Sequence, residues 1–199
     1  MAMRAAIPAF KADFFAHHST DNVEVEFRIG KFINKYFDTN VGEESFFKMK
    51  QFLEKYKAWE SVTNREYEVF SSKSGRRTII DASDDSQHSE IKRSLSKIDY
   101  RTSELPFDVR MAISTEIPCE GGSNDVFDYV KRKLRTSFVR KGLSIDMTVV
   151  TGSPDDPDDE EDTSYQVEFE IIKPGSVGDI NALYNHMHKI IDLLKGLDC

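Results

Sequence analysis

The chain has 199 residues, of which 39% are hydrophobic and 31% charged, a composition typical of soluble globular proteins and a length that suits a single domain, residues 1–199. No apolar run approaches the length of a membrane-spanning helix and the N-terminus lacks the apolar stretch of a signal peptide, so we expect no membrane association. The excess of 35 acidic over 27 basic residues argues against a broad nucleic-acid-binding surface, and the two cysteines, Cys119 and Cys199, are too few for a disulfide framework or a cysteine metal site.

The apolar periodicity predicts mainly strands, with two helices. In chain order, the expected elements are a strand at 22–30, an amphipathic helix at 43–59, a hairpin at 65–81 that turns near Ser74-Gly75, strands at 88–100 and 107–117, a hairpin at 131–151 that turns at Lys141-Gly142, a strand at 165–172 and a final helix at 177–197. The first of these helices carries one apolar stripe, formed by Phe46, Met49, Phe52, Leu53 and Tyr56.

Two features look like metal sites but have the wrong spacing. Residues 155–162 carry seven acidic side chains without the alternating ligands and central glycine of an EF-hand, so we interpret them as a solvated loop. His17 and His18 lie in a polar N-terminal stretch, and His186 and His188 lie two residues apart on the final helix, whereas helical metal ligands favour the i, i+4 spacing. We interpret all four histidines as surface or packing residues.

Several strands with few helices to cover them leave sheet edges that need protection, and closing the sheet into a barrel removes them. We therefore expect a mainly β fold of the α+β kind, with a closed antiparallel barrel and the helices packed outside it. Helices in that position would form a second apolar layer with the outer face of the sheet.

The residues that alternate with the apolar ones are unusual. The first strand carries Glu24, Glu26 and Arg28 on one face, the last strand carries Gln166, Glu168 and Glu170, and the second hairpin carries Lys133, Arg135 and Ser137 on one arm and Asp146 and Thr148 on the other. A single charged face is consistent with the wet side of an antiparallel sheet. Two strands with paired carboxylates, others with clustered cations, and bulky apolar residues opposite them favour charged faces that point into the barrel.

Such an interior predicts a bound ligand. Carboxylates a few ångströms apart repel one another, and a divalent cation relieves the repulsion. Carboxylate oxygens without a His or Cys cluster suit Mg²⁺ or Mn²⁺, and the opposing Lys and Arg side chains suit phosphate oxygens. The pattern therefore predicts a metal-dependent reaction on a phosphorylated substrate, in which a carboxylate orients the attacking water.

These motifs resemble those of the triphosphate tunnel metalloenzymes. Glu24-x-Glu26 and Glu168-x-Glu170 are similar to the paired acidic signatures of the family, Lys131-x-Lys133-x-Arg135-x-Ser137 to its basic strand, and Ile145-Asp146-Met147-Thr148 to the strand that follows. The match is to the RNA 5′-triphosphatase branch, found in fungi, protozoa and large DNA viruses. The resemblance covers residues 22–172 and implies a tunnel of about eight antiparallel strands.

The resemblance also implies the roles of individual residues. Acids that match Glu24, Glu26 and Glu170 hold the metal, Mg²⁺ or Mn²⁺, in the family, and acids that match Asp146 and Glu168 act through water. Lys133 and Arg135 match residues that grip the phosphates, and Arg77 and Lys92 match further phosphate-binding positions. Glu116 resembles another tunnel acid that would orient water, although a surface acid at the end of a strand fits its sequence context almost as well.

The chain departs from the family pattern at Gln166, where the final acidic strand usually carries a third glutamate. It also has no Lys-x-Asp-Gly motif, so a separate guanylyltransferase is the implied partner for capping. The implied activity is hydrolysis of the γ-phosphate of 5′-triphosphate RNA, the first step of mRNA capping, with free nucleoside triphosphates as side substrates. The implied location is intracellular, in a nucleus, a virus-infected host cell or a virion. The alternative is a non-catalytic barrel that binds polyphosphate or RNA ends beside a capping enzyme.

Overall fold

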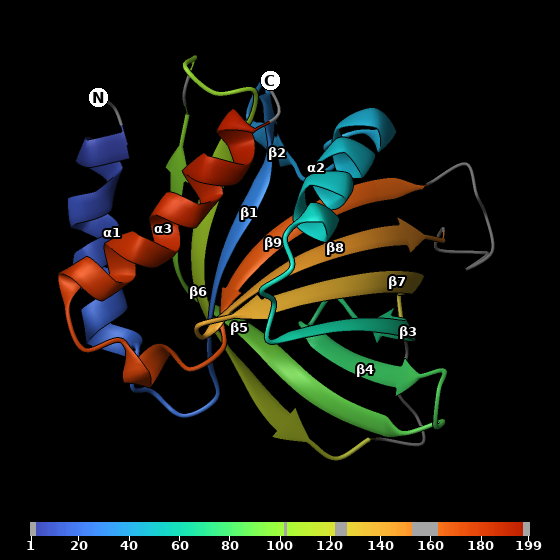
Figure 1. Ribbon diagram of the computed structural model, residues 1–199. Helices are drawn as coiled ribbons and strands as arrows, with labels where there is room; N and C mark the ends of the chain where they lie inside the picture. The colour runs from blue at the N-terminus through green and yellow to red at the C-terminus, as the bar shows by residue number, and fades with distance from the viewer. Residues whose placement is uncertain (1–2, 102, 122–126, 153–162, 197–199) are drawn as a thin grey trace.

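The computed structural model describes residues 3–101, 103–121, 127–152 and 163–196, so the acidic run at 155–162 lies outside the described residues. The elements, shown in Figure 1, are α1 (Met3–His17), β1 (Val23–Ile33), β2 (Tyr36–Asp38), α2 (Glu43–Lys55), β3 (Ser61–Ser71), β4 (Arg76–Asp81), β5 (Gln87–Tyr100), β6 (Asp108–Cys119), β7 (Tyr129–Arg140), β8 (Leu143–Thr151), β9 (Ser164–Ile171), a 3-10 turn at Pro174–Ser176 and α3 (Ile180–Lys195).

Eight strands form a closed antiparallel barrel, as the sequence predicted. Their order is β1-β6-β5-β4-β3-β7-β8-β9, and β9 pairs again with β1, which closes the ring. The closing register places Glu26 opposite Glu170 and Arg28 opposite Glu168. The short strand β2 pairs with the end of β1 and lies outside the ring.

The main hydrophobic core lies outside the barrel, between its strands and the helices. The outward-facing residues of β1, Val25, Phe27 and Ile29, are wholly buried, and α1 contributes Phe10 and Phe14 to the same core. The apolar stripe of α3 adds its buried residues, Leu183, Met187, Ile190, Leu193 and Leu194. Figure 1 shows all three helices on the outside of the barrel. In the described part of the chain, no helix is both long and apolar enough to cross a membrane.

The structure corrects the predicted elements in three places. The N-terminal stretch expected to be polar forms α1, because Phe10 and Phe14 lie four residues apart on one helical face and are buried. The first predicted helix ends at Lys55 rather than at residue 59, and the indole N–H of Trp59 donates a 2.8 Å hydrogen bond to the carbonyl oxygen of Leu53. The third difference is β2, a strand of three residues that the sequence pattern does not predict.

Candidate active site

The barrel encloses a cavity of about 180 Å³. It is lined by Glu24, Glu26, Arg28, Tyr67, Val69, Arg77, Ile79, His88, Glu90, Lys92, Glu116, Lys133, Arg135, Asp146, Glu168 and Glu170. All ten residues assigned to the site from the sequence are among them. They come from seven different strands, and the barrel brings them together because side chains alternate between its two faces.

The wall of the cavity carries more acidic than basic charge. It contains seven carboxylates against five lysine and arginine side chains. If all of these groups are ionised, the excess is two negative charges, which equals the charge of one divalent cation. The cavity wall as a whole therefore fits a metal ion better than a bare anion.

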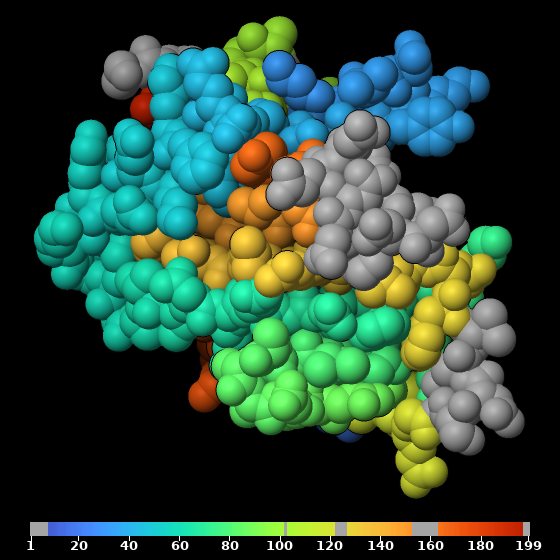
Figure 2. Space-filling model, turned by 90° about the vertical axis from the view of Figure 1, so that its right-hand side faces the viewer, coloured from blue at the N-terminus to red at the C-terminus, as the bar shows by residue number. Residues whose placement is uncertain are grey.

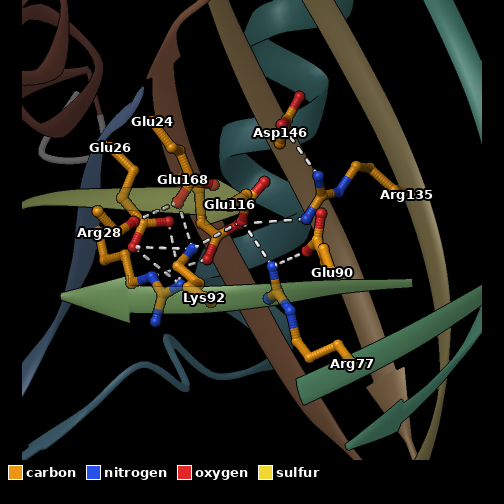
Figure 3. A network of polar contacts seen from close by, with 11 residues as sticks. Glu24, Glu26, Arg28, Arg77, Glu90, Lys92, Glu116, Arg135, Asp146 and Glu168 are labelled. Atoms are coloured by element: carbon orange, nitrogen blue, oxygen red, sulfur yellow. Dashed lines mark hydrogen bonds and ion pairs between the residues drawn. The ribbon is translucent and has the colours of Figure 1, made fainter. Parts of the chain in front are cut away.

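The acidic end of the cavity is organised around Lys92 of β5. Its ammonium group forms an ion pair with Glu24 and approaches Glu116 and Glu26 at 3.1 and 3.8 Å (Figure 3). The Ser114 hydroxyl donates a 2.8 Å hydrogen bond to Glu24. Lys92 thus neutralises several carboxylates at once, in the part of the cavity where a metal would have to compete with it.

Arg28 joins the two acidic strands. Its guanidinium lies 3.0 Å from a carboxylate oxygen of Glu26 and 2.9 Å from one of Glu168. Burial opposes ionisation of Glu168, but the positive charges of Arg28, Arg135 and Lys133 outweigh burial and lower its pKa to about 2. Glu168 is therefore a permanent anion at neutral pH.

Arg135 is held from several sides. It donates hydrogen bonds to the Thr148 hydroxyl at 3.0 Å, to Asp146 at 3.3 Å and to Glu168 at 3.2 Å. Its guanidinium also lies 5.5 Å from the centre of the Tyr67 ring. Burial raises the pKa of the Tyr67 phenol to about 12, so Tyr67 is a neutral hydrogen-bond donor. These contacts fix the plane of the Arg135 guanidinium within the tunnel.

Arg77 lies on the other side of Glu116. It donates to Glu116 at 2.6 Å and also pairs with Glu90, as Figure 3 shows. Glu116 therefore lies between Arg77 and Lys92, both of which contact it. This position inside the tunnel excludes the alternative that Glu116 is a surface acid at the end of a strand.

Lys133 differs from the other cations of the cavity. Arg28, Arg77, Lys92 and Arg135 each have carboxylate partners, whereas Lys133 makes no ion pair with any residue in the described ranges. Burial, together with the positive charges of Arg135, Arg77 and Arg28, lowers its pKa to about 8, although the negative charge of Glu168 opposes this shift. An enclosed ammonium with no carboxylate at ion-pair distance is a site for an anion that enters the cavity.

The residues proposed to hold a metal line the cavity but do not form a closed ligand set. Among the residues that the structure describes, no three His, Cys, Asp or Glu side chains are grouped as a metal site. The carboxylates nevertheless carry uncompensated charge: burial, then Glu24 and Asp146, raise the pKa of Glu170 to about 7. Burial, together with the charges of Glu168 and Glu24, also raises the pKa of Glu26. An all-oxygen group with this repulsion fits Mg²⁺ or Mn²⁺.

Several cavity residues were not assigned to the site from the sequence. Arg28 was placed on the charged face of the first strand without a role, and Tyr67, His88 and Glu90 were not singled out. A signal for Glu90 existed, since it lies two residues before Lys92 on the same strand and must share its face. Tyr67 had a similar signal in its register with Lys133 across β3 and β7, which only the strand pairing reveals.

Comparison with known proteins gives the family of the chain. The family described as mRNA capping enzyme, beta chain, matches residues 34–198. The chain belongs to this family. Its members are RNA triphosphatases with a triphosphate tunnel, which confirms the resemblance inferred from the motifs.

Solved structures show the same fold. The RNA triphosphatase Pct1 of S. pombe superposes with a TM-score of 0.79 at 16% identity, over 99% of this chain and 92% of that one. Pct1 in complex with the Spt5 CTD gives 0.74 at 15% identity, over 99% and 93%. The triphosphatase of the Mimivirus capping enzyme gives 0.65 at 15% identity, over 94% and 96%. A search of curated proteins finds no match.

Proposed function

We propose that this chain is a metal-dependent RNA 5′-triphosphatase. It hydrolyses the γ-phosphate of 5′-triphosphate RNA, leaves a 5′-diphosphate end for a separate guanylyltransferase, and accepts free nucleoside triphosphates as side substrates. Membership of the capping-enzyme family supports the class of reaction. The charged tunnel supports a triphosphate as the group that reacts.

One observation carries the proposal: Lys133 is enclosed in the tunnel without a carboxylate partner, beside an excess of carboxylates. A structural ion-pair network would leave no cation of this kind, because a buried unpaired charge destabilises the fold. A polyphosphate supplies the missing anionic partner. The opposing carboxylates would then interact with the phosphate through a bound cation. One metal–triphosphate ligand would thus use both the acidic and the basic residues of the site.

The basic residues would bind and orient the substrate. Lys133 would contact the terminal phosphate as a point charge, and Arg135 would present the fixed plane of its guanidinium to two phosphate oxygens. Arg77 and Lys92 would contact the remaining phosphates after exchanging their pairing with Glu116. These interactions absorb charge that develops on the phosphoryl oxygens during transfer.

The acidic residues divide into two groups in this proposal. Glu24, Glu26 and Glu170 would hold Mg²⁺ or Mn²⁺, which when bound supplies charge neutralisation for the phosphoryl oxygens. Asp146, Glu168 and Glu116 would orient the attacking water by accepting its hydrogen bonds. Asp146 is positioned for this by the Ser144 hydroxyl, which donates to it at 2.6 Å, and by Arg135.

The proposal is tested by phosphate release from 5′-triphosphate RNA and from ATP, with Mg²⁺, with Mn²⁺ and with chelator. We expect release from both substrates only when metal is present, and a 5′-diphosphate end on the RNA. The Lys133→Gln variant should lose most of the activity while remaining folded, because it removes a charge that forms no direct ion pair with the described residues. Binding of triphosphate RNA without phosphate release would instead support the non-catalytic alternative.

A further inference from the structure

A short hairpin, made of the end of β1 and β2, continues β1 beyond the cavity. The inward-facing positions of β1 continue from Arg28 to Gly30, on the cavity side of the strand. A Cβ atom at Gly30 would collide with the carbonyl oxygen of Asp38 and would lie 2.9 Å from the ring of Phe37. The hairpin therefore lies over the inner side of β1, immediately beyond Arg28.

Stacked aromatic and guanidinium groups hold the hairpin in place. The Phe32 and Phe37 rings lie 5.1 Å apart, centre to centre. The Arg101 guanidinium lies 3.7 Å from the centre of the Phe32 ring, and that of Arg110 lies 4.5 Å from the centre of Phe37. Arg110 is itself fixed by hydrogen bonds of 2.7 and 3.0 Å to Asp99. The hairpin is thus a braced platform on the end of the barrel.

The tip of this platform is exposed and combines an aromatic ring with positive charge. Tyr36 is 81% exposed, and Lys35 beside it and Lys31 on the same face of the hairpin are exposed as well, whereas the exposed Arg101 lies on the opposite face, over Phe32. Within the described ranges these three cations form no ion pair, although Lys31 and Arg101 lie over aromatic rings. In the space-filling view of Figure 2, the blue atoms of the hairpin project at the upper right. An exposed ring flanked by cations matches a nucleotide, with its base and its phosphate.

The cavity face of β1 changes charge toward the hairpin. Along β1 the acids Glu24 and Glu26 come first and Arg28 follows, and Arg28 lies opposite Arg110 of β6 in the register. Arg28, paired with Glu168, is therefore the cavity residue of β1 nearest to the hairpin.

We propose that the β1–β2 hairpin binds the 5′-terminal nucleotides of the substrate RNA. Tyr36 stacks on a base, and Lys31 and Lys35 contact the phosphates of the strand that leaves the tunnel. Stacking on an aromatic ring tolerates any base, which suits an enzyme that must accept every transcript. This inference rests on the proposed function and assigns its preference for RNA over free triphosphates to a surface outside the cavity.

The test compares two substrates in the full-length protein. One is a 5′-triphosphate RNA of about 10 nucleotides, a length within the range of single-strand binding sites, and the other is inorganic tripolyphosphate, which has no base to stack. Tyr36→Ala should lower kcat/KM for the RNA by at least about fivefold, an effect at the low end of base–aromatic stacking. It should leave kcat/KM for tripolyphosphate unchanged, and Tyr36→Trp should keep the RNA activity.

Tyr56→Ala is the matched control, since Tyr56 is also an exposed tyrosine, at 43%, but follows α2 instead of lying on the hairpin. Equal losses on both substrates, or no loss on RNA, would overturn the inference. RNA affinity measured by fluorescence anisotropy separates the two proposals. A protein without hydrolytic activity would refute the proposed function, whereas the loss of RNA affinity in Tyr36→Ala would still support the hairpin as the binding surface.

Discussion

The two faces of the same barrel strands are held by different forces. On the outer face of β1, Val25 and Phe27 are wholly buried against the helices. On the inner face of the same strand, Glu26 and Arg28 form an ion pair, and Arg28 also pairs with Glu168 of the neighbouring strand β9. Burial of apolar surface stabilises by about 25 cal/mol per Å², whereas buried ion pairs contribute little net stability once desolvation is included.

This difference indicates that the two faces of each strand have different roles. The outer residues and the helices fix the barrel, so the inner residues are free to carry a charge arrangement that serves a ligand and not the fold. Substitutions on the two faces should therefore separate activity from stability.

The largest effect is expected from Glu26→Gln on the inner face. The substitution keeps the size of the side chain and removes a carboxylate whose pKa is raised by burial and by its acidic neighbours. We expect hydrolysis to fall by at least about a thousandfold, the equivalent of ~4 kcal/mol, because the metal loses a ligand. Thermal stability in chelator should stay level or rise, as happens when a strained site is relaxed.

The same variant gives a direct test of metal binding. Mn²⁺ should raise the melting temperature of the wild type and leave Glu26→Gln nearly unmoved, since only a protein that binds the ion is stabilised by it. A variant that melts far lower in chelator and yet keeps its response to metal would show that Glu26 is structural, paired with Arg28 and Lys92.

In the core outside the barrel, Leu183→Ala should lower stability and leave activity unchanged. Leu183 of α3 is fully buried in the core between the helix and the barrel. Removing its side chain should lower the free energy of unfolding by about 3 kcal/mol, through lost burial and the cavity that remains. Chemical denaturation measures this loss. The kcat of the folded protein should be unchanged, and a large fall in kcat at low temperature would show that the two faces are coupled.

Arg135→Lys tests geometry alone, because the charge is retained. The lysine cannot reproduce the planar group that Thr148, Asp146 and Glu168 hold in place. We expect kcat/KM to fall by about tenfold, or ~1.4 kcal/mol of transition-state stabilisation, with little change in stability. Unchanged kinetics would mean that Arg135 acts as a general positive charge.

Strand periodicity was sufficient to predict the barrel and its inverted polarity. Polar and apolar residues alternate in β1 from Val23 to Ile29 and in β9 from Tyr165 to Ile171, and both patterns match the structure. The N-terminal helix was missed because Phe10 and Phe14 stand among polar and small residues, and their burial depends on Phe27 of a distant strand. Tertiary packing, not local pattern, decides such a segment.

The composition of the cavity was predictable from the sequence, but its pairing was not. The ten assigned residues all line it. Which cation lacks a partner depends on register: Lys133 lies opposite Tyr67 and Val150, whereas Arg28 lies opposite Glu168. A shift of one residue in any of these strands would reverse the faces, so the isolation of Lys133 follows from the closed barrel and from no single motif.

The smallest effect concerns pH and again separates the two faces. The pKa of Glu170 is about 7 in the folded protein against 4.5 in the unfolded chain, so the folded state holds the proton more tightly. The resulting stabilisation is complete below pH 4.5 and is lost as the pH rises through 7. His186 of α3 acts in the opposite direction, because burial lowers its pKa.

Glu170→Gln isolates the inner-face contribution: in chelator the variant should match the wild type near pH 5 and melt higher at pH 8, by roughly 2–4 °C for each kcal/mol gained. Parallel melting curves across this range would show that Glu170 ionises normally, and would remove the repulsion on which the metal assignment depends.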